Sequence, residues 1–346
     1  MSRYPVVVVV VAAVLLALAL PAHAENWADN PDYADHAGFA RSRAVCDQLR
    51  AVALPAGNRA DRRKQGGMDG CDSEALYYGI GMPADPEAAF RCAQLEDGGD
   101  MFGGDMMLAT IYANGRGAPR DLDKAIAIAC RTGWAPAEFD GRVSDLDDYR
   151  QQGDGPADFH WCDAATSGYM SGFCASHDAR IAAARRMAGF QAFAARWNQG
   201  EAKARLEALI TAAENFTQAR GVEIDQTGTL RGAFVVMAEE EVRALLHQDL
   251  QAVAEFKPSL ALALADRDAD AELNRVYKRV MAFRFDVLAG SPTHDGIRKV
   301  QRAWLKYRDA WGDFVRTAAP EVSPQAMANL QTRHRIKQLR GVLHED

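Results

Sequence analysis

The most regular hydrophobic pattern in the chain lies between residues 296 and 314. Apolar side chains recur there at alternating spacings of three and four residues, at Ile297, Val300, Trp304, Tyr307, Trp311 and Phe314. A helix places such positions along one continuous stripe. The residues between them are mostly Arg, Lys, Gln and Asp, which suit a solvated face. Two tryptophans and a tyrosine need apolar partners, so the pattern predicts a buried helix covered by other helices.

Comparable stripes predict helices over most of the chain beyond residue 178. In chain order they comprise Phe190, Phe193 and Trp197; Leu206, Leu209, Ala213 and Phe216; Val242, Leu245, Leu246 and Val253; and Leu273, Val276, Tyr277 and Val280. A last helix is expected to begin after Ser323. Breaks that contain glycine, at 221–232 and 290–296, predict two loops, and loops displayed by a rigid bundle often carry binding residues.

A pattern in the first half of the chain repeats with an offset of 36 residues. Each copy consists of apolar residues at helical spacing, a Gly-x-Gly turn, an aspartate four residues after the turn, and further apolar residues at helical spacing. Glycine permits the positive φ angles of such a turn, and aspartate caps the helix that follows. The repeated turn and cap residues are Gly79, Gly81 and Asp85, and then Gly115, Gly117 and Asp121. They predict two helical hairpins.

Residues 140–158 are acidic and contain glycine, with no helical period, so a domain boundary is expected there. The predicted fold is all-α, with a short helical-hairpin repeat domain (an α/α solenoid) followed by an α-helical bundle. The repeat domain is expected at 25–145, a linker at 146–157 and the bundle at 158–346.

The chain opens with Arg3, an apolar run from Val6 to Leu20, and then Ala22-His23-Ala24. This order is typical of a signal peptide, predicted at 1–24 with cleavage after Ala24. The run is about 15 residues long, whereas a bilayer span needs roughly 20, so an uncleaved anchor is the weaker alternative. No membrane span is expected after cleavage, and the expected location is the periplasm or the exterior.

Six cysteines in an exported protein favour disulfides. The predicted pairs are Cys46–Cys71, Cys92–Cys130 and Cys162–Cys174, although the first four cysteines allow three pairings. His160 and His177 flank the last pair in the sequence, so a zinc site formed by these histidines and cysteines is the alternative. Because oxidised sulfurs cannot ligate zinc, the disulfide is preferred and no metal is expected.

Net charge and motifs narrow the classes of function. The formal net charge is −7, which argues against nucleic acid as a partner and suits a basic one. The chain has no phosphate loop and no dinucleotide fingerprint, so no cofactor is expected. The carboxylates of Glu239–Glu241, Asp266, Asp268 and Asp270 show no pairing suited to glycoside chemistry, and Ser171 lacks a nucleophile elbow. A non-catalytic protein is therefore expected.

Two stretches resemble known families. Residues 108–117, with Asp121, Lys124 and Ala125, resemble a Sel-one-like repeat, a relative of the tetratricopeptide repeat, over roughly 71–143. Residues 271–277, 301–310 and 333–339 resemble the LprI-type lysozyme inhibitor domain, whose hallmarks are an LNxxY helix and a QRxWxxYRDA helix. Gly312 stands where members commonly carry a cysteine. The second resemblance implies binding to, and inhibition of, lysozyme-type muramidases.

The motif residues admit a structural and a recognition role. They are Leu273, Asn274, Tyr277, Gln301, Arg302, Trp304, Tyr307, Arg308 and Asp309. Aromatic packing and satisfied amide and Arg–Asp pairs would explain them structurally, while an acidic group engaging a basic enzyme cleft would be recognition. The basic residues Arg333, His334, Arg335, Lys337 and Arg340 are expected on the solvated outer face of the last helix.

The expected function is that of an exported, non-catalytic binding protein that resembles an inhibitor of lysozyme-type muramidases. Occlusion of the muramidase cleft by a loop or an acidic patch is the hypothetical mechanism, with 221–232 and 290–296 as the candidate loops. The alternative is a cell-envelope adaptor that binds partner proteins through its helical repeats and inhibits no enzyme.

Overall fold

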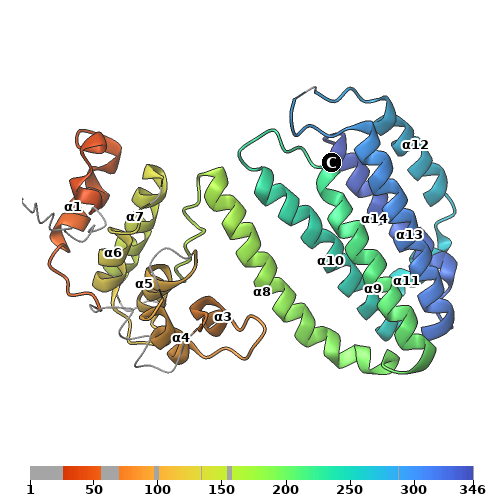
Figure 1. The fold of residues 1–346 in the computed structure, drawn as a ribbon, viewed down its shortest axis with the longest axis horizontal. Helices are drawn as coiled ribbons and strands as arrows, with labels where there is room; N and C mark the ends of the chain where they lie inside the picture. The colour runs from red at the N-terminus through yellow and green to blue at the C-terminus, as the bar shows by residue number, and fades with distance from the viewer. Residues whose placement is uncertain are drawn as a thin grey trace, which may run out of the picture.

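A computed structural model describes residues 26–55, 70–96, 101–133, 135–153, 158–286 and 288–345. Over these ranges the chain forms α-helices and short 3-10 helices with no strand, so the predicted all-α fold is confirmed (Figure 1). No helix within these ranges is long and apolar enough to cross a membrane. The signal peptide predicted at 1–24 lies outside the described residues.

Short helices form the N-terminal part of the molecule. Three 3-10 turns (Trp27–Asp29, Pro31–Tyr33 and Ala37–Phe39) precede α1 (Ala40–Gln48), α3 (Ser73–Tyr78), α4 (Pro86–Ala93), α5 (Gly104–Asn114), α6 (Leu122–Ala129) and α7 (Pro136–Gln152). Their apolar side chains share one hydrophobic cluster, which we call the first core, with Phe159, Trp161, Met170 and Cys174 farther along the chain.

The repeated motif forms two similar hairpins, α3–α4 and α5–α6. Gly79 and Gly115 end the first helix of each hairpin with φ angles of 76° and 63°. The carboxylates of Asp85 and Asp121 accept hydrogen bonds from the amides three residues on, at 2.9 and 3.0 Å. At Gly117 (φ 99°) a Cβ would lie 2.2 Å from the carbonyl oxygen of Pro86 in the other hairpin. The local geometry is therefore as the pattern requires, while the resemblance to Sel-one-like repeats stays a prediction.

The disulfides correct two predicted pairings. The structure joins Cys46 to Cys130 and Cys71 to Cys92, so the pairs Cys46–Cys71 and Cys92–Cys130 are wrong. The N-terminal segment folds back along the end of α6, where the Trp27 amide donates to the Cys130 carbonyl at 2.8 Å. Cys71 instead lies beside Cys92 within the first hairpin. The third predicted pair, Cys162–Cys174, is present, and its sulfurs are therefore not available to zinc.

The predicted linker is also corrected in part. Helix α7 continues through 146–152 because Phe139, Val143 and Leu146 recur on one face and pack into the first core. Residues 154–157 lie outside the described part of the chain. Beyond them, Phe159 and Trp161 still belong to the first core, and the Trp161 indole donates to the Met106 carbonyl at 2.7 Å.

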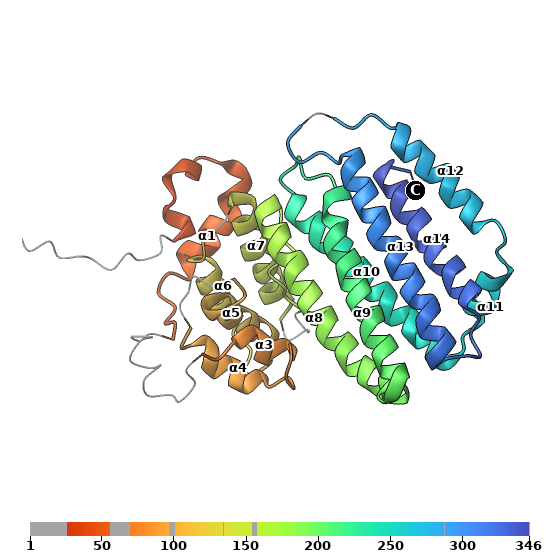
Figure 2. The same ribbon diagram turned by 45° about the vertical axis from the view of Figure 1, so that its right-hand side comes forward.

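The long helix α8 (Gly168–Ala194) links this first part to a helical bundle (Figures 1 and 2). Its first turns pack Met170 and Cys174 in the first core, and its last turns place Phe190 and Phe193 against the second. The change of core therefore occurs within α8, beyond the boundary predicted from the sequence.

The bundle continues with a 3-10 turn (Ala195–Trp197), α9 (Gly200–Arg220), a second 3-10 turn (Gly221–Glu223), α10 (Arg231–Glu255), α11 (Pro258–Ala265), α12 (Ala269–Ala282), α13 (His294–Ala318) and α14 (Pro324–Val342). All six stripe residues of α13 are buried in the second core, as predicted. Helix α13 packs on α9 and α14. The ring of Tyr307 stacks on Phe216 of α9, and Trp197 meets Phe314 edge to face.

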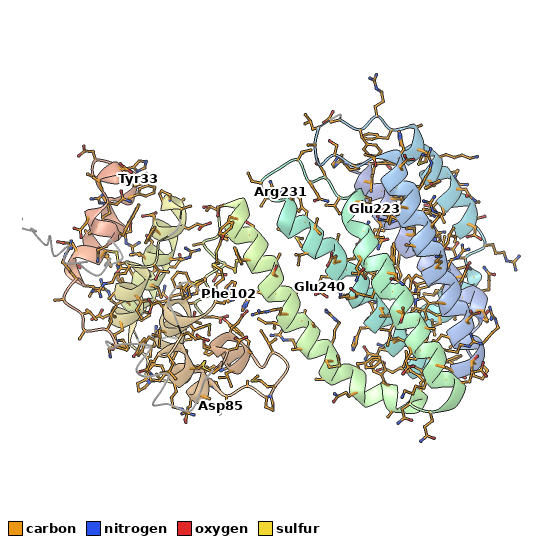
Figure 3. The ribbon with its side chains drawn as sticks, viewed as in Figure 1. Tyr33, Asp85, Phe102, Glu223, Arg231 and Glu240 are labelled. Carbon is orange, nitrogen blue, oxygen red and sulfur yellow. A yellow bond between two sulfur atoms is a disulfide. The ribbon has the colours of Figure 1, made fainter. Side chains whose placement is uncertain are left out.

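A histidine pair, in which His177 is buried and His160 half-buried, joins α8 to the first part of the molecule. The Nε2 atoms of His160 and His177 lie 3.0 Å apart, and Nδ1 of His177 contacts the carboxylate of Glu74, which also pairs with Arg180. The Cys162 amide donates to Nδ1 of His160 at 3.2 Å. Phe102, labelled in Figure 3, stacks on the His177 ring. Each nitrogen is satisfied when both imidazoles are neutral, because His160 then donates to His177 and His177 donates to Glu74.

Protonation of His177 is expected to lower the free energy of unfolding by about 2–3 kcal/mol as the pH falls from 6.5 to about 4. Burial lowers the pKa of His177 to about 4, and protonation would set two N–H donors against each other at the His160 contact. Since the unfolded chain binds this proton near pH 6.5, stability is lost as the pH falls through this window. Urea unfolding at several pH values measures the loss. A His177→Asn variant should show a shallower slope, and identical slopes would contradict the assignment.

Candidate functional site

The two predicted loops meet at one end of the bundle. The Gln226 amide donates to the Gly290 carbonyl at 2.9 Å. Gly290 has φ 99°, and a Cβ there would lie 2.7 Å from the carbonyl oxygen of Gln226. A Cβ on Gly296 would likewise lie 3.0 Å from the carbonyl oxygen of Val222. Glycine thus allows the two backbones to touch. Segment 221–230 and the described residues of segment 283–292 (283–286 and 288–292) form one surface, which we call the loop surface.

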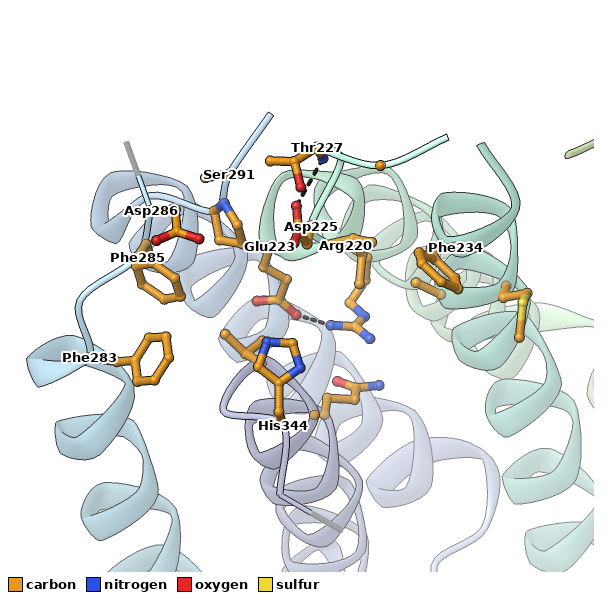
Figure 4. A pocket seen from close by; sticks show the side chains of 18 of the residues that line it. Arg220, Glu223, Asp225, Thr227, Phe234, Phe283, Phe285, Asp286, Ser291 and His344 are labelled. Atoms are coloured by element: carbon orange, nitrogen blue, oxygen red, sulfur yellow. Dashed lines mark hydrogen bonds and ion pairs between the residues drawn. The ribbon is translucent and has the colours of Figure 1, made fainter. Parts of the chain in front are cut away.

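A pocket of about 920 Å³ opens between the two segments of the loop surface (Figure 4). Phe234 and Met237 of α10 line one side, and Phe283 and Phe285, which follow α12, line the other. Glu223 lies between them, and the end of α14 contributes Lys337, Gln338 and His344. The walls are therefore largely aromatic and aliphatic, with charged groups at the base and the mouth.

Large apolar side chains stand exposed around this pocket. The exposed fractions are 46% for Phe234, 59% for Met237 and 62% for Leu288. The carboxylates of Asp225 and Asp286 lie at the rim, both exposed. Hydrogen bonds from Thr227 lower the pKa of Asp225 and keep its turn closed, with the Thr227 amide 2.9 Å from the carboxylate. A rim of exposed apolar groups with carboxylates beside them is typical of a protein-binding surface.

A buried ion-pair network supports the loop surface from below. Glu223 is 1% exposed, and its two oxygens accept from the guanidinium of Arg335, itself 0% exposed, at 2.6 and 2.8 Å. Arg220 also pairs with Glu223, and Gln301 accepts from Nε of Arg335 at 2.9 Å. Burial alone would raise the pKa of Glu223, but Arg335 and Arg220 outweigh it and hold that pKa below its ordinary value.

This network limits the chemistry that the pocket can perform. Both oxygens of Glu223 are held by guanidinium groups, and its low pKa makes it a poor proton donor. Among the described residues of the pocket, the remaining carboxylates are those of Asp225, Glu241 and Asp286. Asp225 accepts from its own turn, and Glu241 lies 3.3 Å from Arg220. The geometry favours binding over acid–base catalysis.

The prediction that the basic residues of the last helix lie on a solvated face is wrong for Arg335. Lys337 is exposed, but Arg335 is buried, and three other basic residues of α14 tie it to its neighbours. Arg333 pairs with Asp266 and Glu272, Arg340 pairs with Glu272 at 2.6 Å, and His334 lies 3.2 Å from Asp249. Helices α11, α12 and α13 pack against α14, and these pairs hold its basic side chains against neighbouring helices. The sequence alone gave no sign of this, because each acidic partner lies far away along the chain.

The predicted motif residues divide between core and surface, and none of them lines the pocket. Leu273, Trp304 and Tyr307 are buried in the second core, and Tyr277 packs against it. Gln301 belongs to the buried network. Arg308 lies over the Trp304 ring at 5.0 Å and 3.4 Å from Asp270. Asn274, Arg302 and Asp309 are exposed. The buried members act as scaffold, and a recognition role for the three exposed ones stays a hypothesis.

Comparison with known proteins identifies one segment. Residues 259–339 match the family model described as lysozyme inhibitor LprI, which confirms the resemblance for this segment. The segment runs from α11 into α14 and includes Phe283–Asp286 on one wall of the pocket. The opposite wall, from Arg220 to Glu241, precedes it. No curated protein and no solved structure matches the chain.

Proposed function

We propose that this protein binds a lysozyme-type muramidase through its loop surface and inhibits it by covering the catalytic cleft. The match of residues 259–339 to the LprI inhibitor family carries the proposal. The geometry supplies a surface, because two segments distant in sequence meet beside an apolar pocket. A non-catalytic role agrees with the inhibitor family and with the engaged state of Glu223.

The two segments of the loop surface are held in place in the free protein, which supports a role in inhibition. The Glu223–Arg335 pair and the Gln226–Gly290 hydrogen bond hold both segments before a partner arrives, which lowers the entropic cost of binding. Exposed Phe234 and Met237 provide apolar anchors. The net charge of −7 and the carboxylates of Asp225 and Asp286 would attract a basic enzyme.

The proposed location is a cell-envelope compartment or the exterior. The three disulfides within the described residues suit an oxidising environment, where muramidases meet peptidoglycan. Export through the signal peptide at 1–24, with cleavage after Ala24, is part of the same proposal.

The full mature protein, oxidised, should slow peptidoglycan lysis by at least one of the C-type, G-type or bacterial muramidases, at a stoichiometric ratio. A Phe234→Ala/Met237→Ala variant should raise the inhibition constant by roughly 30-fold or more, as expected for anchor residues at about 2 kcal/mol or more. Lysis rates at varied inhibitor concentration provide the measurement.

A Met187→Ala/Leu262→Ala variant is the matched control, because both side chains are exposed and apolar but, unlike Phe234 and Met237, do not line the pocket at the loop surface. It should inhibit as the wild type does. Equal loss in both double variants would refute the assigned surface. No slowing of any muramidase at a large molar excess would refute inhibition for these enzymes and favour the adaptor alternative.

A further inference from the structure

A second surface lies along the side of the bundle, between α9 and α13. A shallow groove of about 680 Å³ is lined by Lys299, Arg302 and Lys306 of α13 and by Thr211 and Asn215 of α9. The groove is also lined by Ala208, Ala212 and Ala303, whose small side chains leave space between the two helices. The groove shares no lining residue with the pocket at the loop surface.

The three cations of the groove differ from their neighbours on the same helix. Arg298 pairs with Asp295 at 2.6 Å, Arg308 lies 3.4 Å from Asp270, and Arg316 pairs with Asp313 at 2.7 Å. Lys299, Arg302 and Lys306 are exposed, and none forms an ion pair with any residue that the structure describes.

The acidic residues of the facing helix are already engaged. Glu207 lies 3.7 Å from Lys203, and Glu214 is 3.1 Å from Arg243 of α10. The groove therefore concentrates three uncompensated positive charges on a protein whose net charge is −7. A local excess of this sign attracts anions against the overall charge of the molecule.

The spacing of the cations suits an extended ligand. Positions 299, 302 and 306 follow one another at helical intervals of three and four residues, so they form a row roughly 10 Å long. The guanidinium of Arg302 can bind a carboxylate or a phosphate through two parallel hydrogen bonds, and the lysines add point charges on either side. Thr211 and Asn215 offer a hydroxyl and an amide to polar groups of the same ligand.

We propose that this groove binds an extended polyanion that carries carboxylate or phosphate groups at intervals along its chain. The inference does not depend on inhibition of a muramidase. If the polyanion were part of the cell wall, binding would concentrate the protein at the polymer that muramidases cut.

Binding of the full mature protein to immobilised poly-L-glutamate and to immobilised polyphosphate tests the proposal. At least one polymer should bind, and raising the salt from 50 to 200 mM should weaken binding by roughly 20-fold, as expected when about three charges are neutralised. The variant Lys299→Glu/Arg302→Glu/Lys306→Glu should bind at least tenfold more weakly. The polymer that binds more tightly identifies the anionic group.

The matched control is Arg267→Glu/Arg275→Glu/Lys278→Glu, which makes the same change of charge at exposed residues before and on α12. It should bind within about threefold of the wild type, since none of these three residues lines the groove. Failure of the wild type to bind either polymer would overturn the proposal, and so would equal loss in both triple variants. Unchanged muramidase inhibition in the groove variant would show that the two surfaces act separately.

Discussion

Replacement of Glu223 by alanine is expected to lower the free energy of unfolding by about 3–5 kcal/mol. The carboxylate is buried between two guanidinium groups, those of Arg335 and Arg220. Its removal leaves positive charge in the core of the bundle without a partner, and burial of an unpaired charge is far more costly than loss of a surface ion pair. Urea unfolding followed by circular dichroism measures the effect.

A half-exposed ion pair elsewhere in the bundle supplies the control. Glu214→Gln removes the half-exposed pair between α9 and α10 and should cost about 1 kcal/mol or less. The double variant Glu223→Met/Arg335→Met removes both principal charges and should recover much of the lost stability, because a hydrophobic pair can replace a buried ion pair at little cost. If the double variant is as unstable as Glu223→Ala, the cause is not the unpaired charge.

The same substitution connects stability with the proposed function. Glu223 lies in the first turn of segment 221–230, and Arg335 belongs to α14, so the pair fixes that segment to the bundle. Loss of this anchor should weaken muramidase inhibition under conditions in which the variant remains folded. Retention of full inhibition by folded Glu223→Ala would show that the loop surface does not need this support.

Removal of the Cys46–Cys130 disulfide is expected to destabilise the first part of the molecule by about 4–5 kcal/mol. The bridge closes a long loop, with a sequence separation of 84, and fastens α1 and the N-terminal turns to the end of α6. On the chain-entropy account, a long loop restricts the unfolded chain more than a short one does. The double variant Cys46→Ser/Cys130→Ser, studied by urea unfolding with the other bridges intact, measures the loss.

The Cys71–Cys92 bridge provides the comparison, since its sequence separation is 21. Its removal by two Cys→Ser changes should cost about 3 kcal/mol, less than removal of the longer bridge. Peptide mapping of the oxidised protein should recover Cys46 linked to Cys130. A peptide that links Cys46 to Cys71 would contradict the fold of the N-terminal segment.

Local sequence patterns sufficed for the most regular helix and for the turns and caps of the repeated hairpins. The stripe from Ile297 to Phe314 predicted a buried helix, and it lies in the second core. Gly79 and Gly115 adopt the positive φ angles that their turns require, and Asp85 and Asp121 cap the helices that follow. These features depend on residues within one or two turns of each other, which is the range over which periodicity and capping act.

The predictions were wrong where the structure depends on contacts between residues that are far apart in sequence. Cys46 pairs with Cys130 because the N-terminal turns fold back onto α6, and no local pattern encodes that path. The acidic stretch after Asp140 lacked an obvious period, yet Phe139, Val143 and Leu146 suffice for a helix once the first core covers them. The basic residues of α14 were expected in solvent, because the sequence does not show that Arg335 forms a buried ion pair with Glu223.

By itself, the sequence determined the all-α class and the segment similar to a lysozyme inhibitor family. The second loop, predicted at 290–296, lies earlier, between the end of α12 at Ala282 and the start of α13 at His294. Only the tertiary structure decided that the two segments of the loop surface lie together, that Glu223 and Arg335 are buried beneath it, and that α8 contributes to both cores. The physical reason is that helix formation and capping are set by neighbours along the chain. The pairing of loops, charges and cysteines is set by the packing of helices that are far apart in sequence.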